Sequence, residues 1–146
     1  FGKLDFKKFH PAGNLGNKLK TAYDLMLTKT KIPFVNENTN MKNALIILNK
    51  KKLGFLVVIN NYGLNTGIFT DGDLKRLIQK RKFRNNLKIK SVMTKKPFIV
   101  EENTLASDIL TQMNKRKITS VCIYNKKNKK KTIGVLHIHH LLKLVK

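Results

Sequence analysis

The chain has 146 residues, of which 41% are hydrophobic, and it carries a formal net charge of +23. This composition suffices for one domain or for two small repeats with a shared core, and the apolar runs are far shorter than the roughly 20 residues of a membrane-spanning helix. The single cysteine, Cys122, excludes a disulfide within the chain, and we expect a cytoplasmic location.

The first expected elements lie between residues 32 and 51. The chain starts at Phe1 with neither an initiator methionine nor a signal peptide, so we expect a segment of a longer protein. Residues 32–35 are apolar and contain a proline, which predicts an edge strand because proline has no N–H to donate within a sheet. Thr39 is the expected N-cap of a helix, since apolar residues between 41 and 48 follow it at helical spacing.

A hairpin and a second helix complete the first half. Two strand-like runs, 55–59 and 66–69, are joined by an Asn-Asn-Tyr-Gly segment. Asparagine and glycine tolerate the positive φ of a tight turn, so the two runs predict a β-hairpin. Leu74, Leu77 and Ile78 share one face of the closing helix. The first half is therefore a β-α-β-β-α unit.

The second half repeats this plan. Gly-Ile-Phe-Thr at 67–70 corresponds to Gly-Val-Leu-His at 134–137, and Tyr-Asp-Leu-Met at 23–26 corresponds to Lys-Ser-Val-Met at 90–93. One such unit would bury little surface by itself, so we expect the two units to share a core. The elements expected here are an edge strand at 97–100, a helix with Thr104 as N-cap, a hairpin of 120–124 and 132–136, and a closing helix with Leu141, Leu142 and Val145.

The positive charge suggests a polyanionic partner, such as nucleic acid or an anionic membrane. The lysines are nevertheless spread over the whole chain and accompany many asparagines, which is typical of an AT-rich genome. The one dense cluster, at 126–131, lies between two expected strands, where a charged run is usually a solvated loop. We therefore rank nucleic-acid binding last among the functions considered and expect no membrane partner.

The order of the elements and the Gly-x-x-Thr-x-x-Asp motif at 67–73 resemble the pair of cystathionine-β-synthase (CBS) motifs. In that family two β-α-β-β-α motifs pack sheet to sheet, and this motif contacts a nucleotide. The resemblance implies an α/β (α+β) fold with pseudo-twofold symmetry. It places CBS motif 1 at 22–86 and CBS motif 2 at 87–146.

The chemistry of this strand-to-helix junction also favours a ligand site. A helix N-terminus attracts a phosphate, the Thr70 hydroxyl adds a donor, and Asp73 can accept hydrogen bonds from a ribose diol. The structural alternative needs no ligand: Thr70 caps the helix, and Asp71 and Asp73 complement its dipole. The candidate ligand contacts also include Asp71, Ile32, Pro33, Thr119 and Ser120.

The second copy of the motif has His137 and His140 where the first has threonine and aspartate. Two imidazoles can still bind a sugar or a phosphate, so both are candidate ligand contacts, and their titration makes them a candidate pH-responsive element. Histidine is also a common zinc ligand, but no cysteine or carboxylate lies near in sequence, and we expect no metal site. Met26 and Met93 are expected to pack in the core, and Cys122 to be a buried side chain.

The N-terminal segment 9–19, Phe-His-Pro-Ala-Gly-Asn-Leu-Gly-Asn-Lys-Leu, resembles the end of the sugar isomerase (SIS) domain in D-arabinose 5-phosphate isomerases, which CBS motifs follow. Residues 116–121 and 134–142 resemble that family too, although it more often has aspartate where His140 stands. The resemblance implies that residues 1–21 are the end of a SIS domain and a linker. His10 is then a candidate remnant of the isomerase site, but the segment lacks the groups that proton transfer requires and should not be catalytic.

The parent enzyme implied by this resemblance interconverts D-ribulose 5-phosphate and D-arabinose 5-phosphate for Kdo and lipopolysaccharide biosynthesis. The CBS pair would then be a regulatory module that senses a nucleotide-bearing ligand, with CMP-Kdo as the candidate and an adenine nucleotide as the alternative. No cofactor is expected, and the expected partners are the parent SIS domain and a second CBS pair in a homodimer. A structural oligomerisation module without a ligand is the alternative function.

Overall fold

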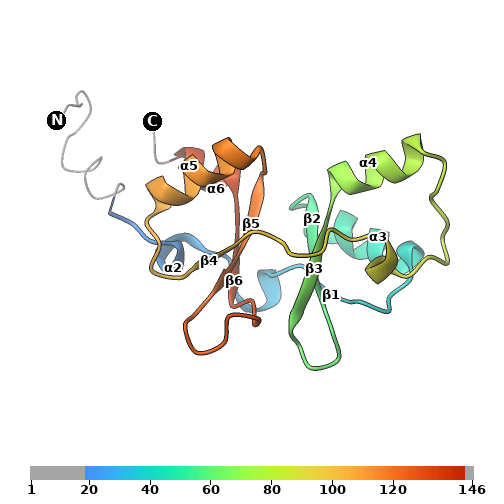
Figure 1. Ribbon diagram of the computed structural model, residues 1–146, viewed down its shortest axis with the longest axis horizontal. Helices are drawn as coiled ribbons and strands as arrows, with labels where there is room; N and C mark the ends of the chain where they lie inside the picture. Colours follow the sequence, from blue (N-terminus) through green and yellow to red (C-terminus); the bar gives the residue numbers. More distant parts are fainter. Residues whose placement is uncertain (1–18, 144–146) are drawn as a thin grey trace.

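The computed structural model of the protein describes residues 19–143. Two units, each a three-stranded sheet with helices, lie side by side along the long axis of the molecule (Figure 1). None of the helices in this range has the length and apolar character of a membrane span. The elements are α2 (Ala22–Leu25), η1 (Lys29–Lys31), β1 (Phe34–Asn36), α3 (Met41–Lys51), β2 (Phe55–Ile59), β3 (Asn65–Thr70), α4 (Asp71–Gln79), η2 (Ile89–Ser91), β4 (Ile99–Glu101), α5 (Ala106–Arg116), β5 (Ser120–Tyr124), β6 (Gly134–His137) and α6 (Ile138–Leu142).

Each sheet combines a parallel edge strand with an antiparallel hairpin. β1 runs parallel to β2, and β2 runs antiparallel to β3; β4, β5 and β6 repeat this arrangement. A parallel neighbour requires a crossover connection, which α3 and α5 supply. The β-α-β-β-α order predicted for each half is confirmed, as is the position of β1 and β4 at the sheet edges.

The first hairpin turn forms as predicted, whereas the edge strand begins two residues later than the predicted range 32–35. Gly63 has a φ of +78°, and the Asn60 side chain accepts the backbone N–H of Tyr62 and of the residue after Gly63, which closes the first hairpin. Pro33 lies just before β1 rather than within it, and its carbonyl accepts the N–H of Val57 at 2.9 Å. The strand therefore begins where backbone donors become available.

The predicted N-caps of the two crossover helices are wrong. α3 is capped by Asn40, whose side chain accepts the N–H of Asn43 at 3.0 Å, so the helix begins one residue later than a Thr39 cap would place it. Leu105, not Thr104, precedes α5 and offers no side-chain cap. A distant backbone replaces the cap: the first N–H of α5 donates to a carbonyl in the segment before α2 at 2.8 Å.

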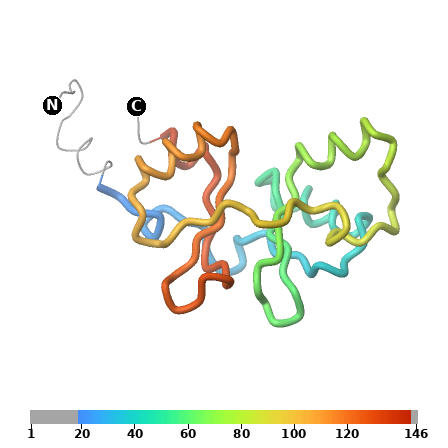
Figure 2. The backbone as a smooth tube through the Cα atoms, viewed as in Figure 1, coloured from blue at the N-terminus to red at the C-terminus, as the bar shows by residue number. Residues whose placement is uncertain are grey.

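The two units exchange their leading segments. The N–H groups of Ala22 and Tyr23 in α2 donate to carbonyls of the second unit, each at 2.9 Å, and Ala22 belongs to the core of that unit. Ile89 in η2 belongs to the core of the first unit, and its N–H donates to the Thr39 carbonyl at 2.9 Å. We call the segment that contains α2 and the segment that contains η2 the crossing segments; Figure 2 shows them between the units, the first in blue and the second in yellow. The exchange ties the units together although each has its own sheet.

In each crossing segment a methionine packs against a glycine of the sheet that the segment joins. A Cβ built on Gly67 in β3 would lie 2.6 Å from Sδ of Met93, which is closer than van der Waals contact allows. A Cβ on Gly134 in β6 would collide in the same way with Met26. The repeated glycine and the repeated methionine are therefore complementary parts of the same packing contact in each half, and both methionines are half-buried and pack against the core clusters.

A third cluster of buried side chains joins the two sheets. It contains residues of both hairpins, so neither unit has a closed core without the other. Cys122 is one of its members and is fully buried, and burial raises the pKa of its thiol to about 12. The predicted buried position of this cysteine and the shared core are both confirmed. The buried members are Ile32, Phe55, Val57, Ile68, Cys122 and Val135.

Candidate functional site

A cleft of about 680 Å³ opens where β3 passes into α4. This volume lies within the roughly 300–1,000 Å³ of small-molecule sites. One wall is the strand-to-helix junction of the first unit. The other wall comes from the second unit: the segment before β4, the end of α5 and the start of β5. The predicted contacts that line the cleft are Thr70, Asp71, Asp73, Thr119, Ser120 and His137.

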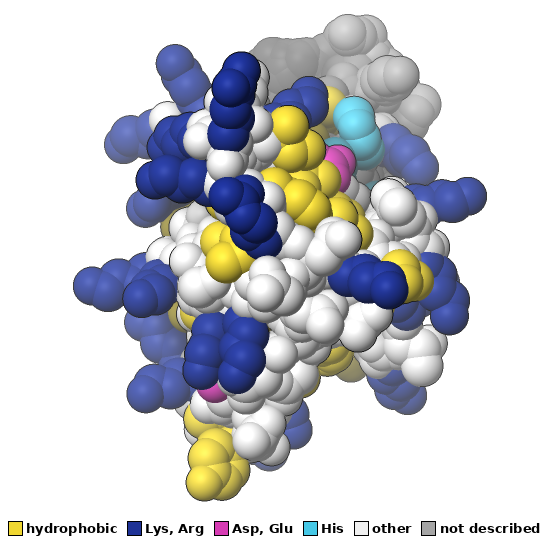
Figure 3. Space-filling model, turned by 90° about the vertical axis from the view of Figure 1, so that its right-hand side faces the viewer, with side chains coloured by type: hydrophobic (Ala, Val, Ile, Leu, Met, Phe, Trp, Pro, Cys, Tyr) yellow, Lys and Arg dark blue, Asp and Glu magenta, His cyan; other side chains and the backbone are white. Residues whose placement is uncertain are grey.

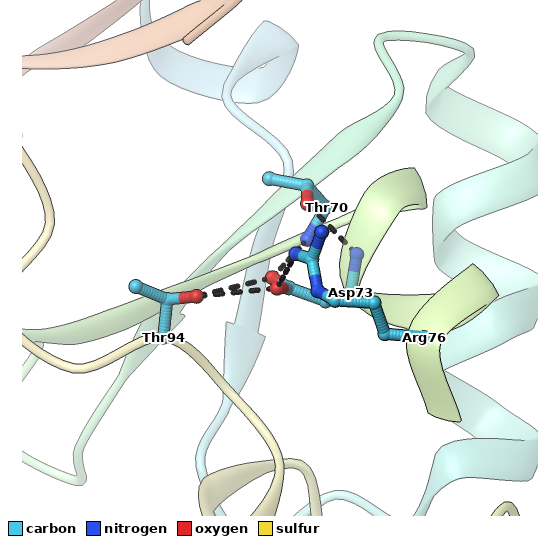
Figure 4. Close-up of polar contacts among 4 residues, drawn as sticks. All are labelled: Thr70, Asp73, Arg76 and Thr94. Carbon is cyan, nitrogen blue, oxygen red and sulfur yellow. Dashed lines mark hydrogen bonds and ion pairs between the residues drawn. The ribbon is translucent and has the colours of Figure 1, made fainter. Parts of the chain in front are cut away.

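Thr70 and Asp73 form a reciprocal capping box at the start of α4. The Thr70 hydroxyl accepts the N–H of Asp73 at 3.1 Å, and the Asp73 carboxylate accepts the N–H of Thr70 at 2.9 Å (Figure 4). This arrangement satisfies two backbone donors that the helix itself leaves unpaired. The structural alternative for Thr70, an N-cap, is thus confirmed.

Asp73 is also the centre of a polar cluster that includes Arg76 of the same helix and Thr94 of the segment between the units. The side chain of Arg76 contacts the carboxylate with Nη2 2.5 Å from Oδ1, and the Thr94 hydroxyl lies 3.3 Å from both carboxylate oxygens (Figure 4). Only 9% of Asp73 is exposed. Thr94 belongs to the crossing segment that leads into the second unit, so Asp73 contacts that segment as well as its own helix.

The second unit contributes polar and aromatic groups to the opposite wall. Ser120 begins β5 and is buried, whereas Thr119 precedes the strand, and its carbonyl accepts the N–H of Ile138 at 2.8 Å. The Arg116 guanidinium lies over the Phe98 ring, 4.2 Å from the ring centroid. This wall offers hydroxyl groups, a cation and a flat aromatic surface, which together suit a nucleotide.

More cationic than anionic side chains border the cleft, so its field favours an anionic ligand. Elsewhere the positive charge is dispersed: Figure 3 shows lysine and arginine side chains around the whole visible face, with few acidic ones. The cationic residues of the cleft are Arg76, Lys96, Arg116 and Lys117, and the anionic ones are Asp71 and Asp73.

His137 and His140 reproduce the capping box at the start of α6 with imidazoles. The N–H of His137 donates to Nδ1 of His140 at 3.1 Å, and the N–H of His139 donates to Nδ1 of His137 at 3.2 Å. Both acceptor nitrogens must be unprotonated. Burial lowers the pKa of His137 and His140, and the neighbouring positive charges of His139 and Lys143 act in the same direction. Both imidazoles are therefore held in the neutral form that the two bonds require.

Three predicted contacts do not line the cleft. Ile32 is only 5% exposed and packs between the two sheets, and Pro33 is buried beside it. The His140 side chain turns back to the backbone of His137. His10 lies outside the described residues. Within residues 19–143 no group of three or more histidine, cysteine, aspartate or glutamate side chains is arranged to hold a metal ion.

Sequence reasoning missed the residues that complete the site. Arg76 stands three positions after Asp73 on the same helix, a spacing that places the two side chains together and could have signalled the ion pair. Thr94 carries no such signal, because it reaches Asp73 only through the crossing of the segment that contains it. The contact between Arg116 and Phe98 likewise joins two elements that are separate in sequence.

The repeated motif, the exchanged leading segments and the cleft between two sheets define a CBS pair. The family model of the CBS domain matches residues 22–80 and 89–146, and the chain belongs to this family. It is related to the C-terminal region of arabinose 5-phosphate isomerases.

Similarity to these isomerases extends over almost the whole chain. The sequence is 38% identical over 98% of its length to the arabinose 5-phosphate isomerase KdsD of Yersinia pestis, and 37% identical over 98% to that of Escherichia coli. It is also 35% identical to the uncharacterized protein RP505 of Rickettsia prowazekii over 99% of its length. The chain spans less than half of these relatives, 43% of both isomerases and 44% of the third protein.

Solved CBS structures share the fold. The protein CBSX2 in complex with AMP has a TM-score of 0.75 and 24% identity, with 86% of this chain and 96% of that one covered. The CBS domain pair of protein MJ0100, in complex with 5′-methylthioadenosine and S-adenosyl-L-methionine, has a TM-score of 0.76 and 20% identity, with 87% and 96% covered. At these identities the likeness concerns the fold.

Proposed function

We propose that this chain is the regulatory CBS pair of an arabinose 5-phosphate isomerase and binds a nucleotide-bearing ligand in the cleft between its two motifs. The observation that carries the proposal is the position of Thr70 and Asp73 at a cleft whose opposite wall contains Thr119 and Ser120 of the other motif. A ligand bound there contacts both motifs at once. Its binding energy can therefore favour one relative packing of the motifs over another.

The chemistry of the cleft sets the class of ligand. The Asp73 carboxylate is an acceptor for a ribose diol, the N-terminus of α4 suits a phosphate, and the surplus of cationic side chains favours an anion. CMP-Kdo, the activated form of the sugar acid whose synthesis the isomerase would supply, is the feedback ligand we propose. An adenine nucleotide is the alternative, supported by the ligands named for the CBSX2 and MJ0100 structures.

In this proposal the parent enzyme interconverts D-ribulose 5-phosphate and D-arabinose 5-phosphate in the cytoplasm for Kdo and lipopolysaccharide biosynthesis. Its SIS domain carries out the reaction, and CBS pairs associate as a homodimer within a homo-oligomer. The similarity to the KdsD isomerases supports this assignment. The proposed boundaries at residues 21 and 86 are those that the family resemblance implies.

Calorimetric titration of the chain with CMP-Kdo, CMP, AMP and ATP tests the ligand proposal. Asp73→Ala should weaken binding by roughly tenfold or more, because a hydrogen bond to a charged group contributes about 1.5–3 kcal/mol. Thr70→Ala should also weaken it. Each variant loses part of a helix cap, which costs about 1 kcal/mol of stability in its own right.

The matched controls come from a second capping box far from the cleft. At the start of α2 the Asp24 carboxylate accepts the N–H of Thr21 at 2.9 Å and the Thr21 hydroxyl at 3.1 Å, and neither residue lines the cleft. Thr21→Ala and Asp24→Ala remove these bonds from an exposed helix start and should leave ligand affinity unchanged. The proposal is wrong if no ligand binds below millimolar concentration, or if both pairs of variants reduce affinity equally.

A structural oligomerisation module is the second candidate function. It is supported by apolar side chains that the closing helices leave exposed: Ile78 of α4 is 57% exposed and Leu142 of α6 is 38% exposed. Sedimentation of the wild type and of an Ile78→Lys variant separates the two functions. A tight dimer that the substitution disrupts, combined with a melting temperature that no nucleotide changes, would favour the structural role.

A further inference from the structure

The carboxylate expected to hold a ribose is already occupied by Arg76. Nη2 of Arg76 lies 2.5 Å from Oδ1 of Asp73, and the two side chains are 60% and 10% exposed. A charge-assisted bond of this kind is about twice as strong as a bond between neutral groups. A ligand that uses Asp73 must therefore compete with a cation that the helix holds in place.

A neutral diol is a poor competitor for this carboxylate. Its two hydroxyl groups can replace the hydrogen bond of Arg76 but not the positive charge, and Asp73 is largely buried, so water compensates little. The guanidinium that is displaced also loses its counter-ion. For a nucleoside without phosphate, the cost of displacing Arg76 therefore offsets much of the binding free energy that its ribose gains at Asp73.

A phosphate reverses this balance because of where the guanidinium lies. A Cβ built on Gly72, in the first turn of α4, would lie 3.5 Å from Nη1 of Arg76 and 3.5 Å from the Thr70 hydroxyl oxygen. The guanidinium thus lies over the N-terminal turn beside the backbone of Gly72, where the helix dipole attracts an anion, whereas the N–H groups of Asp71 and Asp73 already donate to the Gly54 carbonyl and the Thr70 hydroxyl. When a ribose displaces it from Asp73, a phosphate bound at the same turn offers it a new partner.

We propose that Arg76 is a specificity-determining residue that makes the cleft select phosphorylated over unphosphorylated nucleosides. This inference rests on the proposed function of the cleft. The second motif contains no such pair, because His140 and Lys143 stand at the positions of Asp73 and Arg76. Selection of this kind belongs to the first motif alone.

The test compares nucleoside and nucleotide affinities in matched variants. Wild type, Arg76→Gln and Lys75→Gln are titrated with adenosine, AMP, cytidine and CMP at constant salt. Lys75 is the exposed neighbour on α4, so its substitution removes the same charge without touching Asp73. Wild type and Lys75→Gln should prefer each nucleotide over its nucleoside, and Arg76→Gln should reduce that ratio roughly tenfold or more.

The two proposals fail in different ways. If wild type binds none of these four compounds, and neither CMP-Kdo nor ATP, below millimolar concentration, the cleft is not a nucleotide site, and both proposals are wrong. If wild type binds nucleotides and Arg76→Gln keeps the wild-type ratio, only the role of Arg76 is wrong. Arg76→Lys keeps the charge but loses the planar fork, and its ratio should fall between those of wild type and Arg76→Gln. Equal nucleotide-to-nucleoside affinity ratios for wild type, Arg76→Lys and Arg76→Gln also contradict the inference.

Discussion

His137 and His140 perform with imidazoles the capping that Thr70 and Asp73 perform with a hydroxyl and a carboxylate. Each Nδ1 accepts a backbone N–H only while it is unprotonated. Because burial lowers both pKa values below the usual 6.5, the unfolded chain binds protons more readily than the folded one. The start of α6 is therefore stable above about pH 6.5 and loses stability as the pH falls below it.

The double variant His137→Thr/His140→Asp tests this assignment, since it restores the pair found in the first motif. Wild type should lose melting temperature between pH 7 and pH 5, and the variant should lose less because its cap does not titrate in that range. Thermal unfolding followed by circular dichroism measures both. An equal loss in the two proteins would show that the imidazole caps do not carry the acid sensitivity.

At the scale of the elements, contacts between methionine and glycine hold the crossing segments against the sheets. Gly67 leaves the space that Met93 fills, and Gly134 leaves the space for Met26. The backbone of Thr94 exchanges hydrogen bonds with Ile68 at 2.8 and 2.9 Å, directly beside the first of these contacts. A side chain at Gly67 would therefore push the linker away from the strand.

Gly67→Ala should destabilise the protein by about 1–3 kcal/mol, the usual cost of overpacking. Gly72→Ala is the control: its Cβ would meet ordinary contacts at 3.5 Å within a helix, where alanine is favoured by roughly 0.5–1 kcal/mol. Urea unfolding measures both. Adding Met93→Ala to Gly67→Ala should recover part of the loss. A Gly67→Ala protein as stable as the control would contradict the contact.

The strands and their order were predictable because their signals are local. Alternating turns and apolar runs predicted the hairpins, and the repeat predicted that the second half copies the first. The start of α3 had a local signal, because Asn40 beside Thr39 is an equally good cap residue and its side chain caps the helix. The start of α5 was not predictable in this way, because its first N–H donates to Lys20, which lies in an exchanged segment far along the chain. No pattern around Thr104 reports such a partner.

The sequence likewise predicted the part of the site that has local signals and missed the part that depends on packing. The motif identified Thr70 and Asp73, and the repeat identified their counterparts in the second half. The wall that faces them was only partly identified, through Thr119 and Ser120, because the pairing of one motif's helix start with the other motif's strand follows from the packing of the two sheets. Ile32 was predicted to contact the ligand because the sequence does not show how the sheets pack, but it lies in the core between them.

For the whole molecule, the central claim is that a single ligand contacts both motifs in the cleft. The charge of +23 does not by itself favour this claim, because it would also attract a polyanion to any exposed lysines. The lysine loop at 126–131 is separate from the cleft, because none of its lysines lines the cleft. Ligand binding and non-specific attraction should therefore be separable by position.

Mapping of backbone amide chemical shifts during titration with AMP or CMP tests the central claim most directly. The claim predicts saturable shifts at residues 70–73 and, at the same ligand concentration, at residues 117–120 of the other motif. Raising the salt concentration should not move them to another part of the molecule. Shifts confined to residues 126–131 that disappear with salt, or shifts in one motif alone, would contradict it.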